Sequence, residues 1–482
     1  MRRALQCIGT SAALALAGCA STSPKPAVRD TSQLVKNRSG QEITWLGDGG
    51  DDEARKQVSA LLSRELTLSN TVRVALLSNR NLQSLYEELG VAQADLVQAG
   101  LLKNPTLGAT YDFPLDRSGS GFQFSLVTDL LQVFTMGSRK RIARTVLEGT
   151  KYRVAGEVIH HVYEVKTAYF VVQAAQQTLS MRQIVKDAAQ AAVELARRQH
   201  DAGTTSDLDL ANEETLFAQV STDFRRSRAD LASAREHLNR LMGVWGTDAA
   251  WKLTANLSEL PSNDPSLEHL ESRAIAGRYD LAAAHKDVQV VSYALSLAKN
   301  TRWIGSVDAG VDFHREAEGV RLLGPTVSVE LPIFDQRQAV IARIEAQLRQ
   351  VKNREGALAV DIRSEVRELS TRLNVARGVV EDYQRTLVPM REKIVGLSQQ
   401  QYDAMLLGVF QLLIAKQNEI NTYREFIEAL RDYWSLRAEL EWKVGGNLGP
   451  ELSAGSGTPA PALAKEEPNP TKGADKHEHH AP

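Results

Sequence analysis

The sequence predicts a duplicated α+β chain in which two β-hairpins alternate with two long helical hairpins. Three observations predict this fold class. The chain has 482 residues, of which 43% are hydrophobic and 24% charged, as is typical of a folded protein. Two stretches of about 60 residues contain almost no helix-breaking residues. Four short stretches alternate apolar and polar side chains, as half-buried strands do.

Charge and cysteine content exclude several classes of protein. Lys and Arg total 57 against 59 Asp and Glu, whereas a nucleic-acid-binding protein usually has a basic excess. Two cysteines are too few for a zinc cage or a disulfide framework. The sequence has no glycine-rich phosphate loop after a strand, no His-Glu-x-x-His pair and no Gly-x-Ser-x-Gly elbow. We therefore expect no nucleic-acid partner, no cofactor, no metal site and no enzymatic activity.

The N-terminus predicts a lipoprotein signal peptide over residues 1–18. A basic start precedes a short apolar segment, which ends at Leu16-Ala17-Gly18-Cys19. This ending resembles a bacterial lipobox, in which the cysteine, here Cys19, becomes the lipidated first residue. An ordinary secretory peptide cut near the same place is the alternative. The two residues after Cys19 are small and neither is aspartate, which resembles the pattern of lipoproteins sorted to the outer membrane.

An internal duplication organises the rest of the chain. Phe134 and Phe334, each just before a long helical stretch, lie 200 positions apart, and the segments starting at His200 and Tyr402 lie 202 apart. Each half is too long for a solenoid unit, so we interpret the repeat as a duplicated domain. After the signal peptide, the expected parts are an extended leader over 19–55, a first repeat over 56–245, a second repeat over 246–447 and a disordered His-containing tail over 448–482.

Each repeat is expected to hold a helix, a β-hairpin and a long helical hairpin. The β-hairpins are predicted over 105–134 and 304–334, and the helical hairpins over 138–242 and 337–445. Pro389 is expected to kink the second rod. Apolar residues spaced four and three apart form a coiled-coil seam on each rod. The seams are Val158, Val162, Val165, Tyr169 and Val172, and Ile362, Val366, Leu369, Leu373, Ala376 and Val380.

The four alternating stretches predict strands with one apolar face and one polar face. Four strands cannot close a barrel, whereas three copies would supply twelve strands and would satisfy every backbone group in a membrane. A half-buried sheet on a globular core is the alternative. The stretches are 106–113, 122–126, 306–313 and 326–333.

The order and repetition of these features resemble the TolC-type outer-membrane efflux family over about residues 60–445. The lipobox, the duplicated halves, Pro332-Ile333-Phe334-Asp335 before the second rod and the segment 402–413 at the helix turn carry the resemblance. It implies a homotrimeric tube, with a twelve-stranded β-barrel in the outer membrane and an α-barrel across the periplasm. It also implies an exit duct that works with a periplasmic adaptor and an inner-membrane pump. A lipid-anchored periplasmic coiled-coil scaffold without a channel is the alternative.

The resemblance assigns functional positions, and none of them is catalytic. Odd strand positions would face lipid and even positions the lumen, with the loops around Arg117 and His314 outside the cell. The turns between helices would be periplasmic tips that contact the adaptor, with a constriction beside them. The lumen-lining residues are Asp112, Asp308, Asp312 and Glu330; the tip residues are Gly203, Thr204, Thr205, Leu406, Leu407 and Gly408; the constriction candidates are Asp207, Asp209, Phe410 and Gln411.

The constriction departs from the family pattern. Members often close the tunnel with acidic rings just after the second tip, whereas Gln411 and Ile414 stand at the corresponding positions here. We therefore expect an apolar or amide constriction that opens by iris-like movement of the hairpins. At the first tip, Gly203 is expected at a helix C-cap and Ser206 or Asp207 at an N-cap.

The cargo leaves only faint signals in the sequence. The second tip, with Met405 in an apolar setting, is similar to members associated with metal-ion efflux, so heavy-metal ions are one expected cargo. Met405 itself is expected to pack within the tip. The adjacent His160 and His161 point in different directions on a helix and are expected to be structural. The tail histidines His477, His479 and His480 are expected to be solvated rather than a specific metal site.

Overall fold

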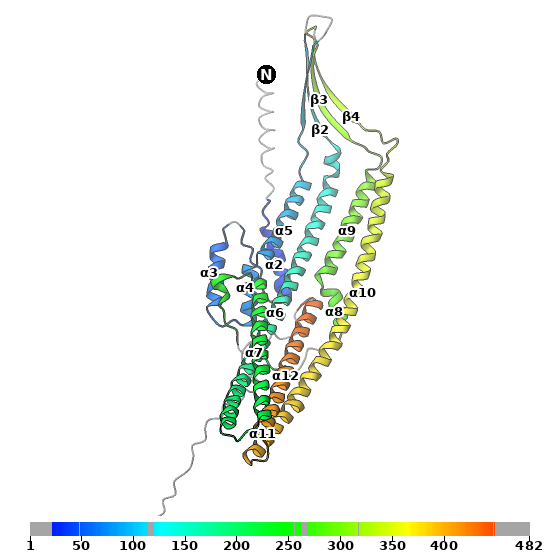
Figure 1. The fold of residues 1–482 in the computed structure, drawn as a ribbon. Helices are drawn as coiled ribbons and strands as arrows, with labels where there is room; N and C mark the ends of the chain where they lie inside the picture. The colour runs from blue at the N-terminus through cyan, green and yellow to red at the C-terminus, as the bar shows by residue number, and fades with distance from the viewer. Residues whose placement is uncertain are drawn as a thin grey trace, which may run out of the picture.

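A long helical body carries a small β-sheet at one end and the turns of two helical hairpins at the other (Figure 1). This architecture comes from a computed structural model, and Cys19, Arg117 and the tail histidines lie outside its described residues. The described residues are 22–47, 49–113, 120–254, 256–261, 268–316, 318–446 and 448.

The first repeat runs through three short helices, two strands and a long helical hairpin. Its elements are α3 (Asp51–Leu62), α4 (Leu68–Ser78), α5 (Arg80–Ala99), β1 (Thr106–Asp112), β2 (Gly121–Asp129), α6 (Leu131–Asp201) and α7 (Asp207–Met242). Asn79 separates α4 from α5, because its side chain accepts hydrogen bonds from the amides of Asn81 and Leu82 and starts the second helix. With 71 residues, α6 is a rod of about 105 Å.

The second repeat has the same order. Its elements are the 3₁₀ turn η1 (Gly246–Ala249), α8 (Leu270–Gly277), α9 (Tyr279–Asn300), β3 (Val307–Arg315), β4 (Arg321–Val329), α10 (Gln338–Asp382), η2 (Tyr383–Leu387), α11 (Val388–Asp403) and α12 (Val409–Lys443). The segment η2 is a π-helix that ends just before Pro389. The kink expected at Pro389 thus takes the form of a π-helical turn, which accommodates the missing proline N–H.

The extended leader predicted over 19–55 is wrong for much of its length. Residues Lys25–Ser39 form a helix, α2, which begins at two prolines and buries Ala27, Val28, Thr31 and Val35. It packs on the central rod, where Asp30 accepts a hydrogen bond from Lys151 at 2.9 Å. The spacing of these four buried residues fits a helix, but the prolines and serines around them hid that signal.

The four strands form one antiparallel sheet in the order β1-β2-β3-β4. Their register places side chains of like polarity in the same row. One row is Leu107, Leu126, Val311 and Pro325, and the next is Gly108, Ser125, Asp312 and Gly324.

Three details of the predicted strands need correction. The apolar residues of β2 stand at even positions, so the rule that odd positions form the apolar face is wrong for that strand, whose register with β1 and β3 sets its phase. β4 ends at Val329, so Leu331 and Ile333 lie beyond the sheet. α6 begins at Leu131, so Phe134 belongs to the helix and not to the β-hairpin.

The core lies along the two predicted seams. All five α6 seam residues are buried, and on α10 Ile362, Val366, Leu369, Leu373 and Val380 are buried with Ala376 packed against them. They meet α12, whose Tyr433 and Trp434 are fully buried. The seams therefore hold the two repeats together along their length. Within the described residues, no helix combines the length and the apolar character needed to cross a membrane.

Leu373→Ala tests the seam. Leu373 is 1% exposed, so its truncation should lower the free energy of unfolding by about 2–5 kcal/mol. The neighbouring Asn374→Ala changes an exposed side chain and should shift it by no more than about 0.5 kcal/mol. Denaturant unfolding of both variants in detergent measures the difference. Equal stabilities would contradict the assignment of the seam as core.

Candidate channel wall and hairpin tips

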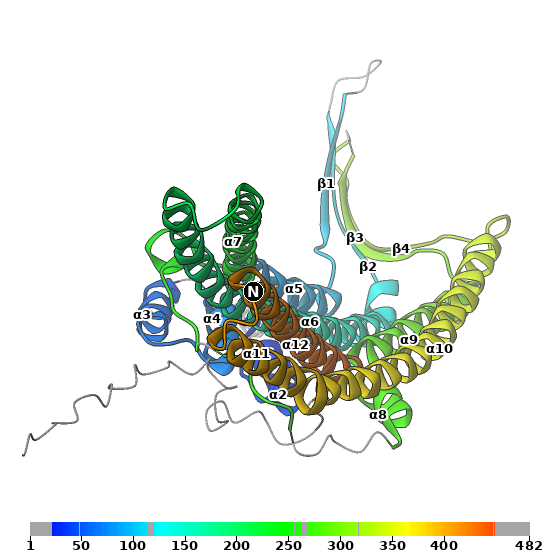
Figure 2. The same cartoon turned by 60° about the horizontal axis from the view of Figure 1, so that its bottom comes forward.

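The sheet stands beyond the helices as a two-faced wall. In the described part of the chain, no helix covers either face of it (Figures 1 and 2). On its apolar face Leu107 is 71% exposed and Leu323 73% exposed, and Phe124, Val311 and Val327 are exposed as well. An apolar surface of this size requires a covering partner, because monomeric proteins rarely leave such a patch in water.

The opposite face collects the carboxylates. Asp112, Asp308 and Asp312 stand on it, and Asp312 accepts a hydrogen bond from the Thr326 hydroxyl of the neighbouring strand. Glu330 lies just beyond β4, where its carboxylate accepts a hydrogen bond from the Ser306 amide at 3.0 Å. The structure thus places three of the four expected residues on one polar face and the fourth at its base.

Sequence reasoning missed Asp129 on this polar face. It pairs directly with Asp308 across β2 and β3. Like charges directly opposite each other are unfavourable unless water or a cation separates them. Asp129 also accepts a hydrogen bond from the Leu131 amide at 3.0 Å and so starts α6. Its place at a strand end, outside the alternating stretch, concealed it.

Both hairpin tips close with the same backbone geometry. At the first tip, the Thr204 amide donates to the Gln199 carbonyl at 2.8 Å. At the second, the Leu406 amide donates to the Gln401 carbonyl at 2.9 Å. Both are Schellman motifs, which need a left-handed residue. Gly203 supplies it at the first tip with φ of 74°, whereas Met405 supplies it at the second with φ of 59°.

The expected helix caps at the first tip are confirmed. Gly203 follows the end of α6 in the left-handed conformation. Of the two N-cap alternatives, the structure has Ser206, whose hydroxyl oxygen accepts a hydrogen bond from the Asp209 amide at 3.2 Å.

The second tip differs from expectation in which side chains it exposes. Met405 is 94% exposed and Leu406 80% exposed, whereas Leu407 is half-buried. The expectation that Met405 packs within the tip is therefore wrong for this chain. Its left-handed backbone turns the side chain outward. Among the other expected tip residues, Thr204 and Gly408 are exposed and Thr205 is half-buried.

The constriction candidates lie beside the two tips, on separate hairpins. Asp207 contacts the His200 ring at 2.7 Å, and Asp209 accepts a hydrogen bond from the Ser206 hydroxyl at 2.7 Å. Phe410 is half-buried and Gln411 exposed in the first turn of α12. Within one chain these four side chains form no ring. The two carboxylates already contact neighbouring side chains at the first tip.

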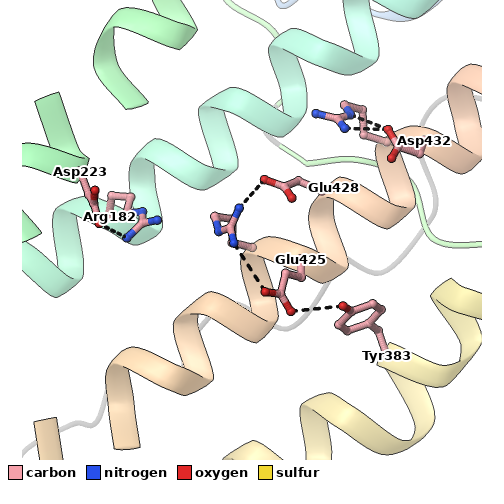
Figure 3. Close-up of polar contacts among 8 residues, drawn as sticks. Arg182, Asp223, Tyr383, Glu425, Glu428 and Asp432 are labelled. Carbon is pink, nitrogen blue, oxygen red and sulfur yellow. Dashed lines mark hydrogen bonds and ion pairs between the residues drawn. The ribbon is translucent and has the colours of Figure 1, made fainter. Parts of the chain in front are cut away.

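Polar contacts tie each hairpin to itself, as Figure 3 shows. Arg182 of α6 pairs with Asp223 of α7 at 3.1 Å, and Tyr383 of η2 donates to Glu425 of α12 at 3.2 Å. Between residues 175–230 and 383–430, all of them described, no ion pair or side-chain hydrogen bond joins the two hairpins. Their contact is apolar, around a cavity of about 60 Å³ lined by Leu216, Val220, Leu413 and Ile420, among others.

Two buried titratable groups belong to the helix packing. His161 contacts the Leu241 carbonyl at 3.0 Å, and burial lowers the pKa of its imidazole below the usual range. His160 stacks on Trp442 instead, so the two rings serve separate contacts as expected. Glu213 is buried with no hydrogen-bond partner among the described residues, and burial together with Asp209 raises the pKa of its carboxyl. No sequence pattern singled out Glu213.

Comparison with known proteins finds similarity to outer-membrane efflux proteins. A family profile described as outer membrane efflux protein matches residues 71–244. The chain is 23% identical over 359 residues to the cobalt-zinc-cadmium resistance protein CzcC of Cupriavidus metallidurans, covering 73% of this chain and 83% of CzcC. The fold is similar to that of the Campylobacter jejuni CmeC outer membrane channel, with a TM-score of 0.69, 12% identity and coverage of 84% and 89%. These matches confirm the resemblance to the TolC-type outer-membrane efflux family.

A second solved structure supports the same fold. The outer membrane protein VceC of Vibrio cholerae is 15% identical, with a TM-score of 0.66 and coverage of 79% of this chain and 97% of VceC. TolC-type proteins are efflux channels of the outer membrane that span the periplasm, not enzymes, and they work with an adaptor and an inner-membrane pump. The channel interpretation is therefore confirmed at the level of the family, over the scaffold alternative.

The two tips allow a matched test of backbone strain. A side chain in the left-handed region costs about 1 kcal/mol, so Met405→Gly should slow hydrogen exchange of the tip amides. Gly203→Ala should speed exchange at the first tip. An added Cβ meets no atom within 4 Å there, so the only cost of the alanine is its positive φ. Exchange measured by mass spectrometry on both hairpins checks this. Faster exchange at the second tip in Met405→Gly would contradict it.

Proposed function

We propose that this protein is the exit duct of a tripartite heavy-metal efflux system, formed by three copies that close a twelve-stranded barrel. The two-faced sheet carries the proposal. It is open at both edges within one chain, since β1 and β4 each have a single neighbour in the sheet order. In a membrane both edges need partners, and β1 of one copy paired with β4 of the next would supply them. Three copies give twelve strands, an even number within the range of outer-membrane barrels.

The polarity of the two faces decides which face of the sheet would contact lipid and which would line the lumen. The apolar face would contact lipid and the carboxylates would line a water-filled lumen. The reverse arrangement would place Asp308 and Asp312 against hydrocarbon, which is costly near the bilayer midplane. Lipidation at Cys19 would add an anchor to the same membrane. Because the barrel itself inserts, the anchor would not be essential to the channel.

The cargo proposal comes from the relative. CzcC is named for resistance to cobalt, zinc and cadmium, and it aligns with most of this chain. The described residues hold no group of three or more His, Cys, Asp or Glu placed to bind a metal ion. We therefore assign selection of the metal to the pump, and to this chain a wide passage.

A strain lacking the gene should gain sensitivity to these metals, while its sensitivity to organic drugs should not change.

The hairpins are proposed to open the tube like an iris. Polar contacts make each hairpin a unit, while the contact between hairpins is apolar and small. A hairpin can therefore tilt without breaking an ion pair to its neighbour in the chain. The tips, with exposed Met405 and Leu406, would be the surface through which the adaptor drives this movement.

Planar-bilayer conductance combined with native mass tests the duct. Detergent-extracted protein should have a trimeric mass and discrete conductance, and a Cys19→Ala variant carrying a cleavable signal peptide should keep both. A monomer without conductance would overturn the barrel. In that case the sheet would be the cap of a periplasmic scaffold.

Asp308→Asn/Asp312→Asn tests the lumen assignment. Removing two carboxylates per chain removes six from a trimer, so the preference of the pore for cations should fall severalfold at low salt. Reversal potentials in a salt gradient measure it. Glu148→Gln, a charge change on α6 away from the sheet, is the control and should have little effect. An unchanged preference in the double variant would contradict lumen-facing carboxylates.

Phe410→Ala and Gln411→Ala test the constriction. If either side chain narrows the closed tube, its truncation should raise the conductance of the closed state in bilayers. Asn418→Ala, on an exposed position two turns further along α12, serves as the control. Unchanged conductance in both Phe410→Ala and Gln411→Ala would contradict a constriction at this level.

A further inference from the structure

Exposed apolar side chains surround the base of the sheet, where α5, α6, α9 and α10 all have one end (Figure 1). Phe134 and Phe334, the landmarks of the duplication, are 79% and 92% exposed there, and Trp303 is 61% exposed. We call this set the girdle. It comprises Leu101, Leu102, Val133, Phe134, Trp303, Ile304, Leu331, Ile333 and Phe334. Aromatic side chains of this kind are enriched where a membrane meets water.

Cations gather at the girdle and in the first turns of the helices below it. We call them the collar, and none forms an ion pair with a carboxylate of the described residues. Arg141 lies over the Tyr293 ring of α9 at 5.6 Å, and Arg302 lies over the ring of Trp303 at 4.3 Å. The collar is Lys103, Arg139, Lys140, Arg141, Arg144, Arg302, Arg337 and Arg343.

Four of the carboxylates at this level make contacts within the chain. Asp129 caps α6 and Glu330 binds the Ser306 amide. Asp335 accepts a hydrogen bond from the Arg337 amide at 2.8 Å, and Glu345 pairs with Lys299 at 2.7 Å. Asp129, Glu330, Asp335 and the nearby Asp308 keep their negative charges, but the eight collar cations outnumber these four carboxylates, so this level carries a net positive charge. Three copies of the chain would carry it around the whole circumference.

In two of the collar guanidinium groups the Nε atom lacks a hydrogen-bond partner among the described residues. The Nε atoms of Arg139 and Arg302 are buried, and neither has a partner among the described residues. A buried N–H of this kind is costly to leave unpaired. Both arginines lie beside girdle residues, since Arg139 reaches the Leu101 carbonyl at 3.5 Å and Arg302 stacks on Trp303.

We infer that the collar binds the phosphate head groups of anionic phospholipids in the leaflet next to the helices. The inference rests on the proposed placement of the sheet in the outer membrane, which puts the girdle at the membrane surface and the collar at head-group depth. Basic clusters directly beside a membrane-spanning element attract anionic lipid, with each cation changing its local concentration by about fivefold. Guanidinium groups bind phosphate in particular, through paired N–H donors.

Trp303 provides a local probe for the test. Wild-type protein is reconstituted in two vesicle mixtures of equal composition, one with brominated phosphatidylglycerol in plain phosphatidylcholine and one with the bromine on the phosphatidylcholine. Bromine quenches nearby tryptophan. Because the chain has 6 tryptophans, the signal of Trp303 is obtained by difference from Trp303→Phe. We expect brominated phosphatidylglycerol to quench Trp303 more strongly than brominated phosphatidylcholine does. The difference should correspond to a phosphatidylglycerol concentration near Trp303 at least about fivefold above that of the vesicle as a whole.

A matched pair of variants assigns the effect to the collar. Arg141→Gln/Arg144→Gln removes two exposed collar cations one helical turn apart, and should reduce the enrichment by about fivefold or more. Arg225→Gln/Arg228→Gln removes an equally spaced, exposed pair from α7, far from the sheet, and should leave it unchanged.

The outcomes separate this inference from the proposed function. Equal quenching by both lipids would place Trp303 at the membrane and keep the barrel, but would overturn lipid binding by the collar. An enrichment that survives in Arg141→Gln/Arg144→Gln would overturn it as well. Quenching by neither lipid would overturn the membrane placement of the sheet and the inference together.

Discussion

Among the described residues, the four strands of the sheet leave one row of backbone N–H and C=O groups without a strand partner on β1 and another on β4. In water these edges invite association, and in lipid they are prohibitively costly until they are paired. The proposed closure between copies would pair both edges, and the apolar face would then contact lipid. The long helices follow from the same constraint, because rods of this length pack only against neighbouring rods. In the proposed trimer a single chain supplies one third of the wall.

Stability is distributed unevenly along that wall. Near the middle, the α6 and α10 seams meet the aromatic residues of α12 in a continuous core. Towards the tips, the two hairpins meet over a small apolar contact, and their polar contacts stay within each hairpin. Firm packing in one part and loose packing in another permits movement of the ends without loss of the fold. The strained turn at Met405 lies at the loosely packed end.

The sequence predicted the periodic parts of the fold well and the irregular parts poorly. The seams and the four strands have strong periods of 3.5 and 2, so their buried residues could be named in advance. The α2 helix was missed because prolines and serines surround its four buried residues. Exposure of Met405 and the pairing of Asp129 with Asp308 depend on backbone conformation and strand register, which no local pattern specifies. A ring at the constriction requires other copies, so one sequence can suggest only candidates for it.

The π-helical turn η2 bears on how the duplicated halves have diverged. From Phe134 to His200 there are 66 positions, and from Phe334 to Tyr402 there are 68. The longer of these two intervals is the one that contains η2. An inserted residue in an α-helix rotates all following residues about the helix axis. A π-turn holds more residues per turn, so it absorbs part of an insertion and reduces that rotation. Each half can therefore change length independently while both ends of the molecule stay aligned. After the duplication, the two rods could therefore come to differ in the number of residues between the sheet and the tip.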